Sequence, residues 1–398
     1  MEYQRYQLRD IGDIVSGATP KTTVAENFGG AIPWLTPADL SGYTQKYISR
    51  GKRNLTQLGY DSCSTQIMPS GTVLFSSRAP IGYTAIAKNP ICTNQGFKSI
   101  VPKPFVNSEF LYYQLIYLRK TIQDMGSGTT FKEISAKKFG AVQVTIPPLV
   151  EQEHIISRIE ELFSQLDVSV NELKTAKERL KVYRQAVLNS CLGDGTLRSI
   201  GECIKSMGQG WSPKCERISI EDDDSWAVIT TTAIQPMNFS FKENKKLPDS
   251  LEPRVKHELK VGDLLITRAG PRSRCGVCCM VKQTKKRLLN CDKVYCLKVN
   301  DLIVLPEYME AVLNAPNFQR EIAFCKTGGN DSGVNLTQSR FLSIEVPTPS
   351  LDIQKMILAK IDANLSVCDS IEKTVDTALQ QVEALRQSIL KKAFEGGL

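Results

Sequence analysis

Four cysteines in the second half of the chain have the residue type and grouping that a zinc site could use. They are Cys275, Cys278, Cys291 and Cys296, and structural zinc is commonly held by four such ligands. The spacing between the last two is loose, and residues 276–281 form an apolar run typical of a buried strand. We therefore expect these thiols to pack in a core as small hydrophobic side chains, and we predict no metal site.

An acidic pair followed by a lysine, Asp249 with Glu258 and Lys260, imitates the metal-binding set of DNA-cutting enzymes. The set lies in a charged segment ahead of the strand expected at Leu264, and the first half of the chain has no equivalent. A repeated enzyme that cuts two strands should carry one set in each copy. We therefore favour a non-catalytic chain. A DNA endonuclease, or a nuclease–methyltransferase component acting through the second half, is the alternative.

Other catalytic chemistry has few residues to draw on. The chain has two histidines, His154 and His257, which leaves little imidazole for acid–base work or for metal binding. It also lacks a Gly-Lys-Ser/Thr phosphate loop and an Asn/Asp-Pro-Pro-Tyr/Phe methyltransferase motif. We predict that the chain has no catalytic residue and binds no cofactor of its own.

Two arginines follow matching sequence patterns. Both Ser70–Arg78 and Val261–Arg268 consist of a turn, an apolar strand and a final pair of a hydroxyl residue and an arginine. Arginine, lysine, asparagine and glutamine read base edges in DNA, while hydroxyl groups and further cations bind phosphates. Arg78 and Arg268 are therefore the best candidates for DNA contact, and the basic cluster Arg50–Arg53 is the next.

Polar and cationic residues in neighbouring loops complete the predicted DNA-binding set. In the first half these residues are Lys21, Thr36, Arg50, Lys52, Arg53, Ser77, Arg78, Gln95, Lys98, Thr129, Thr130 and Lys132. In the second half they are Lys214, Thr230, Thr231, Arg268, Arg272, Arg274, Asn290, Lys293 and Asn330.

The positive charge of the chain is confined to two blocks. The net charge is +8 over 398 residues, a length that suggests two or three domains. Residues 1–149 carry 16 Lys and Arg against 9 Asp and Glu, and residues 196–349 carry 22 against 18, whereas the segments between and after them are slightly acidic. Such blocks suit phosphate binding. No signal-like start or membrane-length apolar run occurs, so we predict a cytoplasmic protein without membrane contact.

The chain contains an internal repeat. Residues 152–195 match residues 354–397 at a constant offset of 202 without a gap. A weaker match of Ile11–Lys21 with Ile200–Lys214 extends the repeat into the parts that precede these segments. The globular parts have diverged while the helical parts have stayed alike. We infer that the helices kept one task and that the globular parts took two versions of another.

Apolar residues in both helical segments recur at alternating three- and four-residue steps, which is the pattern of a coiled-coil seam. Charged residues interrupt the pattern at Lys177 and Arg184 in the first copy and at Glu372 and Arg386 in the second. The predicted seam consists of Ile159, Phe163, Leu166, Val170, Leu173, Leu180, Val187, Ile361, Leu365, Val375, Leu379, Val382 and Ile389. Two such helices in one chain can pack against each other in antiparallel fashion with pseudo-twofold symmetry.

The length of these helices suggests what they could measure. A helix of about 40 residues is on the order of 60 Å long, which is close to two turns of DNA. Two reading domains held that far apart would contact successive faces of the duplex and leave a spacer unread. A coiled-coil assembly protein without a role in DNA binding is the other interpretation of the seam, but it does not explain why each helix follows a basic block.

We predict an α+β fold with two mostly-β recognition domains, each followed by a long helix, and with the helices packed as an antiparallel coiled coil. The predicted divisions are a first recognition domain at residues 1–149, a central spacer helix at 150–195, a second recognition domain at 196–349 and a C-terminal spacer helix at 350–398.

The segments Trp34–Leu40, Pro69–Arg78 and Ile146–Ile156, together with the alternation of diverged domains and similar helices, resemble the specificity subunits of type I restriction-modification systems. The resemblance covers the whole chain. It implies that each domain reads one half of a bipartite sequence in double-stranded DNA and that the helices set the spacing. It further implies that two methyltransferase subunits and restriction or motor subunits bind this chain, with S-adenosylmethionine, ATP and magnesium acting on those partners.

Overall fold

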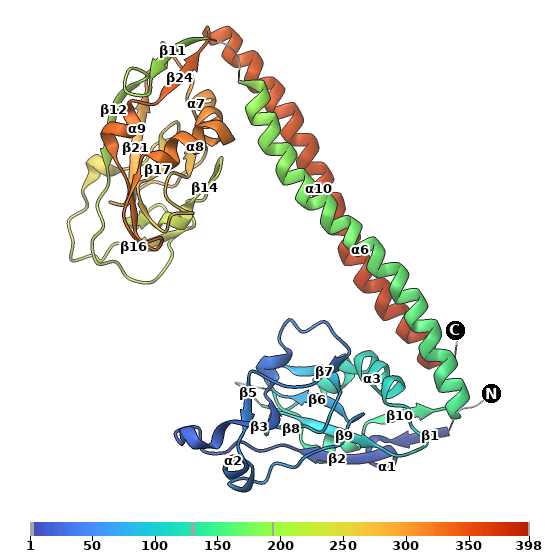
Figure 1. Ribbon diagram of the computed structural model, residues 1–398. Coiled ribbons are helices and arrows are strands. Elements are labelled where there is room, and N and C mark those ends of the chain that lie inside the picture. The colour runs from blue at the N-terminus through green and yellow to red at the C-terminus, as the bar shows by residue number, and fades with distance from the viewer. Residues whose placement is uncertain (1–3, 129–131, 193–194, 397–398) are drawn as a thin grey trace. The chain divides into compact units, whose positions relative to one another are not determined.

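The structure, a computed structural model, describes residues 4–128, 132–192 and 195–396. The chain divides into two compact units, Met1–Leu173 together with Thr377–Leu398, and Lys174–Asp376. Each unit contains a β-rich domain and parts of the two long helices (Figure 1). We name the β-rich part of the first unit domain 1 and that of the second unit domain 2.

Domain 1 is built on a five-stranded sheet with the order β2-β9-β6-β7-β4, beside a three-stranded sheet β5-β3-β8 and the pair β1-β10. The strands are β1 (Gln4–Gln7), β2 (Gly12–Ser16), β3 (Phe28–Leu35), β4 (Tyr47–Ile48), β5 (Arg53–Leu55), β6 (Val73–Ser77), β7 (Ile81–Ala87), β8 (Cys92–Thr93), β9 (Lys98–Pro102) and β10 (Gln143–Ile146). The helices are α1 (Leu8–Ile11), α2 (Gln57–Asp61), α3 (Ser108–Tyr117), α4 (Arg119–Asp124) and α5 (Ala136–Gly140), with 3-10 turns at Ala25–Asn27 and Pro37–Leu40.

Domain 2 repeats this arrangement with different residues. Its sheets are β12-β21-β17-β19, β16-β13-β20, β18-β23-β22, β14-β15 and β11-β24. The strands are β11 (Thr196–Ser199), β12 (Ile204–Gln209), β13 (Ala227–Ile229), β14 (Ile234–Gln235), β15 (Asn238–Phe239), β16 (Asn244–Lys246), β17 (Leu264–Thr267), β18 (Ala269–Gly270), β19 (Cys278–Met280), β20 (Leu288–Leu289), β21 (Val294–Val299), β22 (Lys326–Thr327), β23 (Val334–Leu336) and β24 (Glu345–Thr348). The helices are α7 (Pro306–Asn314), α8 (Pro316–Phe324) and α9 (Gln338–Leu342), with 3-10 turns at Thr231–Ala233 and Val255–His257.

The two domains share the pairing of their strands as well as their order. In domain 1, β3 is antiparallel to β5 and parallel to β8, and in domain 2, β13 is antiparallel to β16 and parallel to β20. Strands β6 and β17 are buried along their whole length. Alternate residues of a strand face opposite sides of the sheet, so Phe75 joins one hydrophobic cluster and Leu74 joins another.

The cysteines of domain 2 lie in its hydrophobic core. Cys278 and Cys279 are successive residues of β19 and are fully buried in different clusters. Burial raises the pKa of Cys291 to about 11 and that of Cys296 to about 12, which keeps both thiols protonated. Across the described ranges no group of three or more His, Cys, Asp or Glu side chains could hold a metal ion.

The fourth residue of each long helix is a buried glutamine that binds the preceding domain. In α6 (Leu149–Cys191), the amide of Gln152 donates to the carbonyls of Phe105 at 2.9 Å and Pro147 at 2.8 Å and accepts from the backbone N–H of Asn107 at 2.8 Å. In α10 (Leu351–Glu395), the amide of Gln354 makes the same three contacts with Ile303, Pro349 and Leu305. The two glutamines are related by the offset of 202, so the repeat has preserved the joint between domain and helix.

The two helices run antiparallel in each unit. In the second unit Lys177 pairs with Asp376 and Arg184 with Asp369, so the residue numbers of α10 fall as those of α6 rise. In the first unit Asp167 of α6 pairs with Arg386 of α10. None of the predicted seam residues is exposed, and the most deeply buried of them are Ile159, Val187, Ile361, Val375 and Val382.

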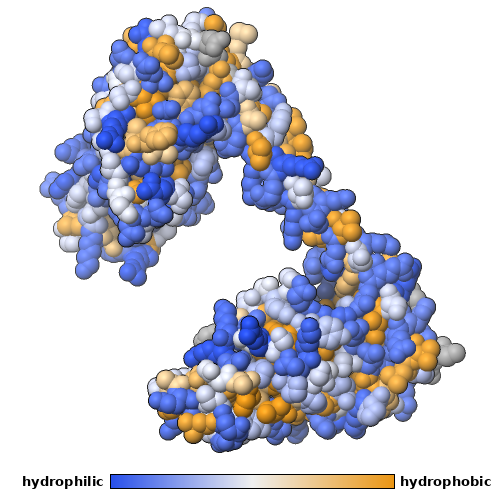
Figure 2. Space-filling model, in the orientation of Figure 1, coloured by the Kyte–Doolittle hydropathy of each residue, from blue (hydrophilic) through white to orange (hydrophobic). Residues whose placement is uncertain are grey.

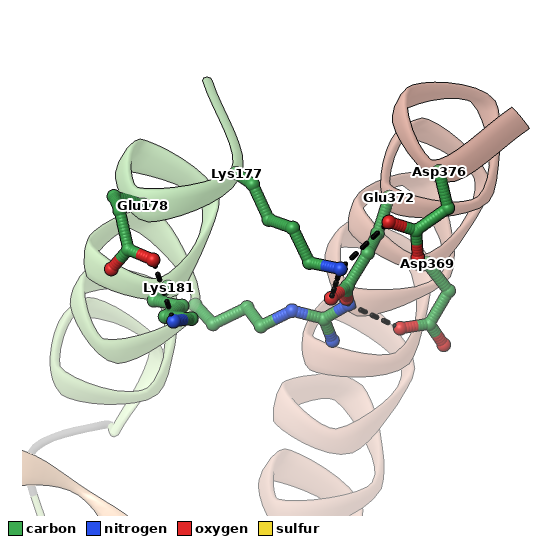
Figure 3. A network of polar contacts seen from close by, with 7 residues as sticks. Lys177, Glu178, Lys181, Asp369, Glu372 and Asp376 are labelled. Carbon is green, nitrogen blue, oxygen red and sulfur yellow. Dashed lines mark hydrogen bonds and ion pairs between the residues drawn. The ribbon is translucent and has the colours of Figure 1, made fainter. Parts of the chain in front are cut away.

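The charged residues that interrupt the seam pair across the helices. Lys177 of α6 lies 3.6 Å from Glu372 and 2.7 Å from Asp376 of α10. Figure 3 shows its side chain directed at these two carboxylates. Arg184 contacts Asp369 at 2.6 Å and Glu372 at 2.9 Å. These polar groups lie on a face that is otherwise apolar, so they favour one alignment of the helices over its neighbours.

The predicted α+β class is confirmed, with two β-rich domains and a long helix after each of them. Within the described part of the chain, no helix has the length and apolar character needed to cross a membrane.

Candidate nucleic-acid interface

Backbone hydrogen bonds bring the predicted loops of domain 1 together. The loop of residues 93–97 lies at the centre and contacts the loops on either side of it. These bonds join Ala18 N to Thr93 O at 3.0 Å, Asn94 N to Leu35 O at 2.8 Å, and Ser77 N to Gly96 O at 2.7 Å. Segments that are far apart in the sequence therefore form one polar surface at the end of β6.

Arg78 lies at that end of β6 and is half-buried. Its guanidinium is 3.7 Å from the carboxylate of Glu133, and the two residues also form an isolated β-bridge. Lys98 lies beneath this surface with 8 % of its area exposed, and its ammonium donates to the carbonyls of Gln95 at 3.4 Å and Phe97 at 3.3 Å. Burial lowers the pKa of Lys98, while Glu133 opposes the shift.

The basic cluster Arg50–Arg53 lines an open cleft with Phe28, Gly29 and Gly30. Arg50 and Lys52 are exposed, and the guanidinium of Arg53 lies 4.7 Å from the centre of the Phe28 ring. Arginine in this position combines a cation with a flat stacking surface. The cleft can therefore accept an anionic or aromatic group, and both occur in DNA.

A single carboxylate shapes this cleft. Asp39 accepts hydrogen bonds from the backbone N–H of Thr36 at 2.8 Å, from the Thr36 hydroxyl at 2.7 Å and from the backbone N–H of Lys52 at 2.9 Å. A side chain at Gly51 would place its Cβ 2.5 Å from the carbonyl oxygen of Trp34, so only glycine permits this approach. The hydroxyl of Thr36 is thus committed to the loop, whereas the Lys52 side chain remains exposed.

Three other predicted residues of domain 1 are exposed, namely Lys21, Gln95 and Lys132. Gln95 accepts a hydrogen bond from Thr19, which ties two loops. Ser77 is fully buried in the structure. Thr129 and Thr130 lie outside the described residues.

In domain 2, Arg268 follows β17 as Arg78 follows β6. Its backbone N–H donates to Lys293 O at 2.8 Å, and its carbonyl accepts from Leu336 N at 2.7 Å. The Nε atom donates to Asp292 O at 2.6 Å, and the guanidinium lies 5.6 Å from the centre of the Tyr295 ring. One edge of the guanidinium is therefore held by the protein, and the side chain remains half-buried at the surface.

The other two arginines of this region connect loops. Arg272 pairs with Asp331 at 2.7 Å. Arg274 donates to the Gln235 side chain at 2.9 Å and to the carbonyls of Thr231 at 2.8 Å and Ile234 at 2.6 Å. Both are predicted DNA-binding residues, but three bonds occupy Arg274, so its guanidinium shapes the loop around Thr231.

The remaining predicted residues of domain 2 differ in exposure. Lys214, Lys293 and Asn330 are exposed, while Thr230 and Thr231 are half-buried. Asn290 is 2 % exposed, and its amide donates to Val294 O at 3.0 Å. Together with Ser77 and Lys98 it forms a group of predicted contacts whose side chains are buried in this structure. The sequence placed them in loops, but packing against neighbouring strands turns them inward.

The two carboxylates of the nuclease-like set, Asp249 and Glu258, bind different groups of domain 2. The Asp249 carboxylate contacts Lys246 at 3.5 Å, whereas Glu258 accepts a hydrogen bond from the backbone N–H of Arg287 at 2.8 Å. The two carboxylates therefore serve different neighbours.

Sequence reasoning missed the acidic residues that organise both surfaces. Asp39 holds the basic cleft, Glu133 faces Arg78, and Asp292 accepts from Arg268 through its backbone. A search for DNA-binding residues selects cations and hydroxyls, so it passes over these partners. Asp39 alone carried a signal, because it lies within the motif Trp34–Leu40.

Figure 2 shows hydrophilic side chains over much of the face in view of each domain, with hydrophobic residues dispersed among them.

Comparison with known proteins agrees with this arrangement. Residues 1–178 match the family described as the type I restriction modification DNA specificity domain. The MjaIX specificity subunit of Methanocaldococcus jannaschii, a type I restriction enzyme component, is 43% identical over 179 residues, which cover 44% of this chain and 40% of that one. The chain therefore matches less than half the length of that relative.

Two further similarities extend over more of the chain. The specificity subunit of the type I restriction enzyme EcoKI of Escherichia coli K12 is 26% identical over 361 residues, which cover 84% of this chain and 76% of that one. A solved chain from a study of assembly and conformational transition in the type I R-M system superimposes with a TM-score of 0.71 at 17% identity, covering 100% of this chain and 98% of that one. This last likeness concerns the fold. Over these segments the chain is similar to the specificity subunits of type I restriction-modification enzymes.

Proposed function

We propose that this chain is the DNA-recognition subunit of a type I restriction-modification enzyme and performs no catalysis itself. Each domain reads one half of a bipartite target in double-stranded DNA, and the sequence between the halves is left unread. The observation that supports this most directly is the duplicated surface around Arg78 and Arg268. Each arginine directly follows a buried strand, and the two strands occupy the same place in the repeated fold. Exposed cations lie in the neighbouring loops.

The chemistry of these arginines fits base reading. A guanidinium presents two parallel N–H groups that match the O6 and N7 acceptors of guanine in the major groove. The contacts with Glu133 and with Asp292 O hold each guanidinium near its strand end before DNA binds. Exposed neighbours such as Lys21, Lys52 and Lys293 are placed to bind phosphates.

The helices support docking of partner subunits. Several large apolar residues of α6 and α10 stay exposed after the helices have paired, among them Val168, Val182, Met356, Val367, Ile371 and Leu385. Exposed apolar residues of this kind mark surfaces that other chains cover. We assign them to two methyltransferase subunits, which bring S-adenosylmethionine, and we expect restriction or motor subunits with ATP and magnesium to join that complex in the cytoplasm.

The test is selection from a random DNA library at physiological salt with the purified chain, alone and with methyltransferase subunits from the same genome. We expect enrichment of two short motifs at a fixed gap. Arg78→Ala should relax one motif and Arg268→Ala the other, at about 1–3 kcal/mol for each lost base contact.

Two matched controls remove an exposed charge at the opposite end of the sheets that carry Arg78 and Arg268. Lys88→Ala lies beyond β7, and Lys260→Ala precedes β17. Both should leave the motifs unchanged. If the chain retains DNA without any sequence preference, or shows no salt-dependent binding, the interpretation as a coiled-coil assembly protein would be favoured. Metal-dependent cutting by the isolated chain would favour the endonuclease alternative.

A further inference from the structure

A lysine of domain 1 bridges the recognition surface to the long helix. Lys46 lies between the 3-10 turn Pro37–Leu40 and the basic cluster Arg50–Arg53. Its ammonium contacts Glu109 of α3 at 2.9 Å and also Glu160 of α6. One cation therefore joins the segment that carries the basic cleft to a helix of the domain and to the spacer helix.

Two tyrosine side chains flank this partly exposed ion pair. The Lys46 ammonium lies 5.5 Å from the ring centre of Tyr47 and 5.7 Å from that of Tyr113. The Tyr47 hydroxyl donates to Glu109, and the Tyr113 hydroxyl donates to Glu160 at 3.3 Å. Burial alone would lower the pKa of Lys46, but hydrogen bonds with Glu160 and Glu109 outweigh it and raise the pKa, so the ammonium stays charged.

The contacts continue from the ion pair into both helices. The ring of Tyr113 meets that of Phe163 of α6 edge to face, with the ring centres 5.9 Å apart. The guanidinium of Arg386 of α10 lies 4.9 Å from the centre of the Phe163 ring and pairs with Asp167. A continuous set of packed groups thus connects Lys46 to the helix pair in the first unit.

Among the residues that the structure describes, domain 2 has no equivalent of this bridge. The offset of 202 relates Glu160 to Asp362 of α10, and over the described residues no ion pair joins Asp362 to domain 2. The buried amide of Gln354 is the joint that both copies share. The charged bridge is therefore an addition to domain 1 and is not required for the fold of the repeat.

We propose that Lys46 is a positioning residue that fixes the angle of domain 1 on α6 and thereby restricts the length of unread spacer that the chain accepts. Rotation of the domain about the joint at Gln152 would carry the basic cleft along the DNA, where successive base pairs are about 3.4 Å apart. A half-buried ion pair that opposes this rotation makes one gap more favourable than its neighbours. This inference rests on the proposed function.

The test is selection of bipartite sites with the full chain carrying Lys46→Met, followed by measurement of the gap in the retained DNA. We expect both half-site motifs to persist, while the preference for the favoured gap over gaps one base pair shorter or longer falls about fivefold. Glu160→Gln removes the negative charge of the same ion pair from the helix and should change the gap preference in the same direction. The double variant Lys46→Met/Glu160→Gln should lower the gap preference little further than either single variant, because both substitutions break the same ion pair.

The controls are Lys88→Met, an exposed lysine next to the same sheet, and Glu161→Gln, the exposed neighbour of Glu160 on α6. An unchanged gap preference in both Lys46→Met and Glu160→Gln would overturn the inference. Loss of one half-site motif in Lys46→Met would do so as well, since Lys46 would then contact DNA.

A measurement without DNA separates this inference from the proposed function. In hydrogen exchange of the full chain, Lys46→Met should speed exchange of the Ile86 amide, which donates to the Lys46 carbonyl at 2.8 Å, and of amides in α3. Unchanged exchange would show that the bridge does not hold the domain. If the unaltered chain enriches no paired motifs, the proposed function itself fails, whatever the exchange rates are.

Discussion

The cationic side chains of the two domains fall into two kinds. Some are engaged in hydrogen bonds within the protein, and others are exposed and available to a ligand. Arg274 is held by three hydrogen bonds to residues 231–235, and Lys98 is buried under its own loop. Arg50 and Lys52 project from a loop whose backbone is fixed by Asp39. A cation of the second kind can bind a phosphate without losing contacts that the fold needs.

Lys52→Ala should weaken binding to all DNA sequences alike and lower the slope of log K against log salt concentration by about 1. The Asp39 contact uses the backbone N–H of Lys52, so the loop should keep its shape in the variant. Fluorescence anisotropy over a series of salt concentrations measures both quantities, with Lys88→Ala as the control. A changed base preference with an unchanged slope would instead make Lys52 a base-reading residue.

At the scale of secondary-structure elements, strands and helices have different tasks. The buried strands β6 and β17 place one arginine at the end of each. The helices α6 and α10 fix their alignment through charges in an apolar seam. Arg184–Asp369 and Arg386–Asp167 are the same ion pair in the two copies, because the offset of 202 exchanges their members. The Lys177 contacts have no such copy, since leucine occupies position 379 and valine position 170.

Arg184→Ala should lower the free energy of unfolding by about 1 kcal/mol, since Asp369 loses its ion pair and Glu372 keeps only the longer contact with Lys177, while the partly exposed site screens the loss. The charge swap Arg184→Asp with Asp369→Arg should recover part of this. Urea unfolding followed by circular dichroism measures the change. Lys181→Ala is the control, because the ion pair of Lys181 lies within its own helix, with Glu178 at 2.7 Å. If Arg184→Ala unfolds at the same urea concentration as Lys181→Ala, Arg184 does not stabilise the alignment of the two helices.

At the scale of the whole molecule, the duplication gives each unit its own core and its own reading surface. Arg78 and Arg268 belong to different units and share no partner among the described residues. Losses from such independent sites add in free energy.

The double variant Arg78→Ala/Arg268→Ala should therefore lose the sum of the two single losses in binding free energy to within about 0.5 kcal/mol. Competition binding against the selected bipartite site measures all three variants under one condition. A loss that is clearly smaller than the sum would mean that one domain stops reading when the other is impaired.

The sequence determined the elements that depend on local pattern. The repeat at an offset of 202 predicted two copies of one fold, and the apolar spacing from Ile159 to Val187 predicted the first long helix and its buried side. These features follow from periodicity, which each segment carries by itself. The strand before Arg78 was predictable from a short apolar run that follows a turn.

Only the tertiary structure decided which polar residues are available. Asn290 and Lys98 have the same side-chain chemistry as exposed candidates, but strands that are distant in sequence bury them. The role of Asp39 and the bridge from Lys46 to Glu160 likewise arise between segments that no local pattern connects. The free energy of burying or pairing a charge depends on the neighbours that the fold brings to it, and a linear sequence does not contain those distances.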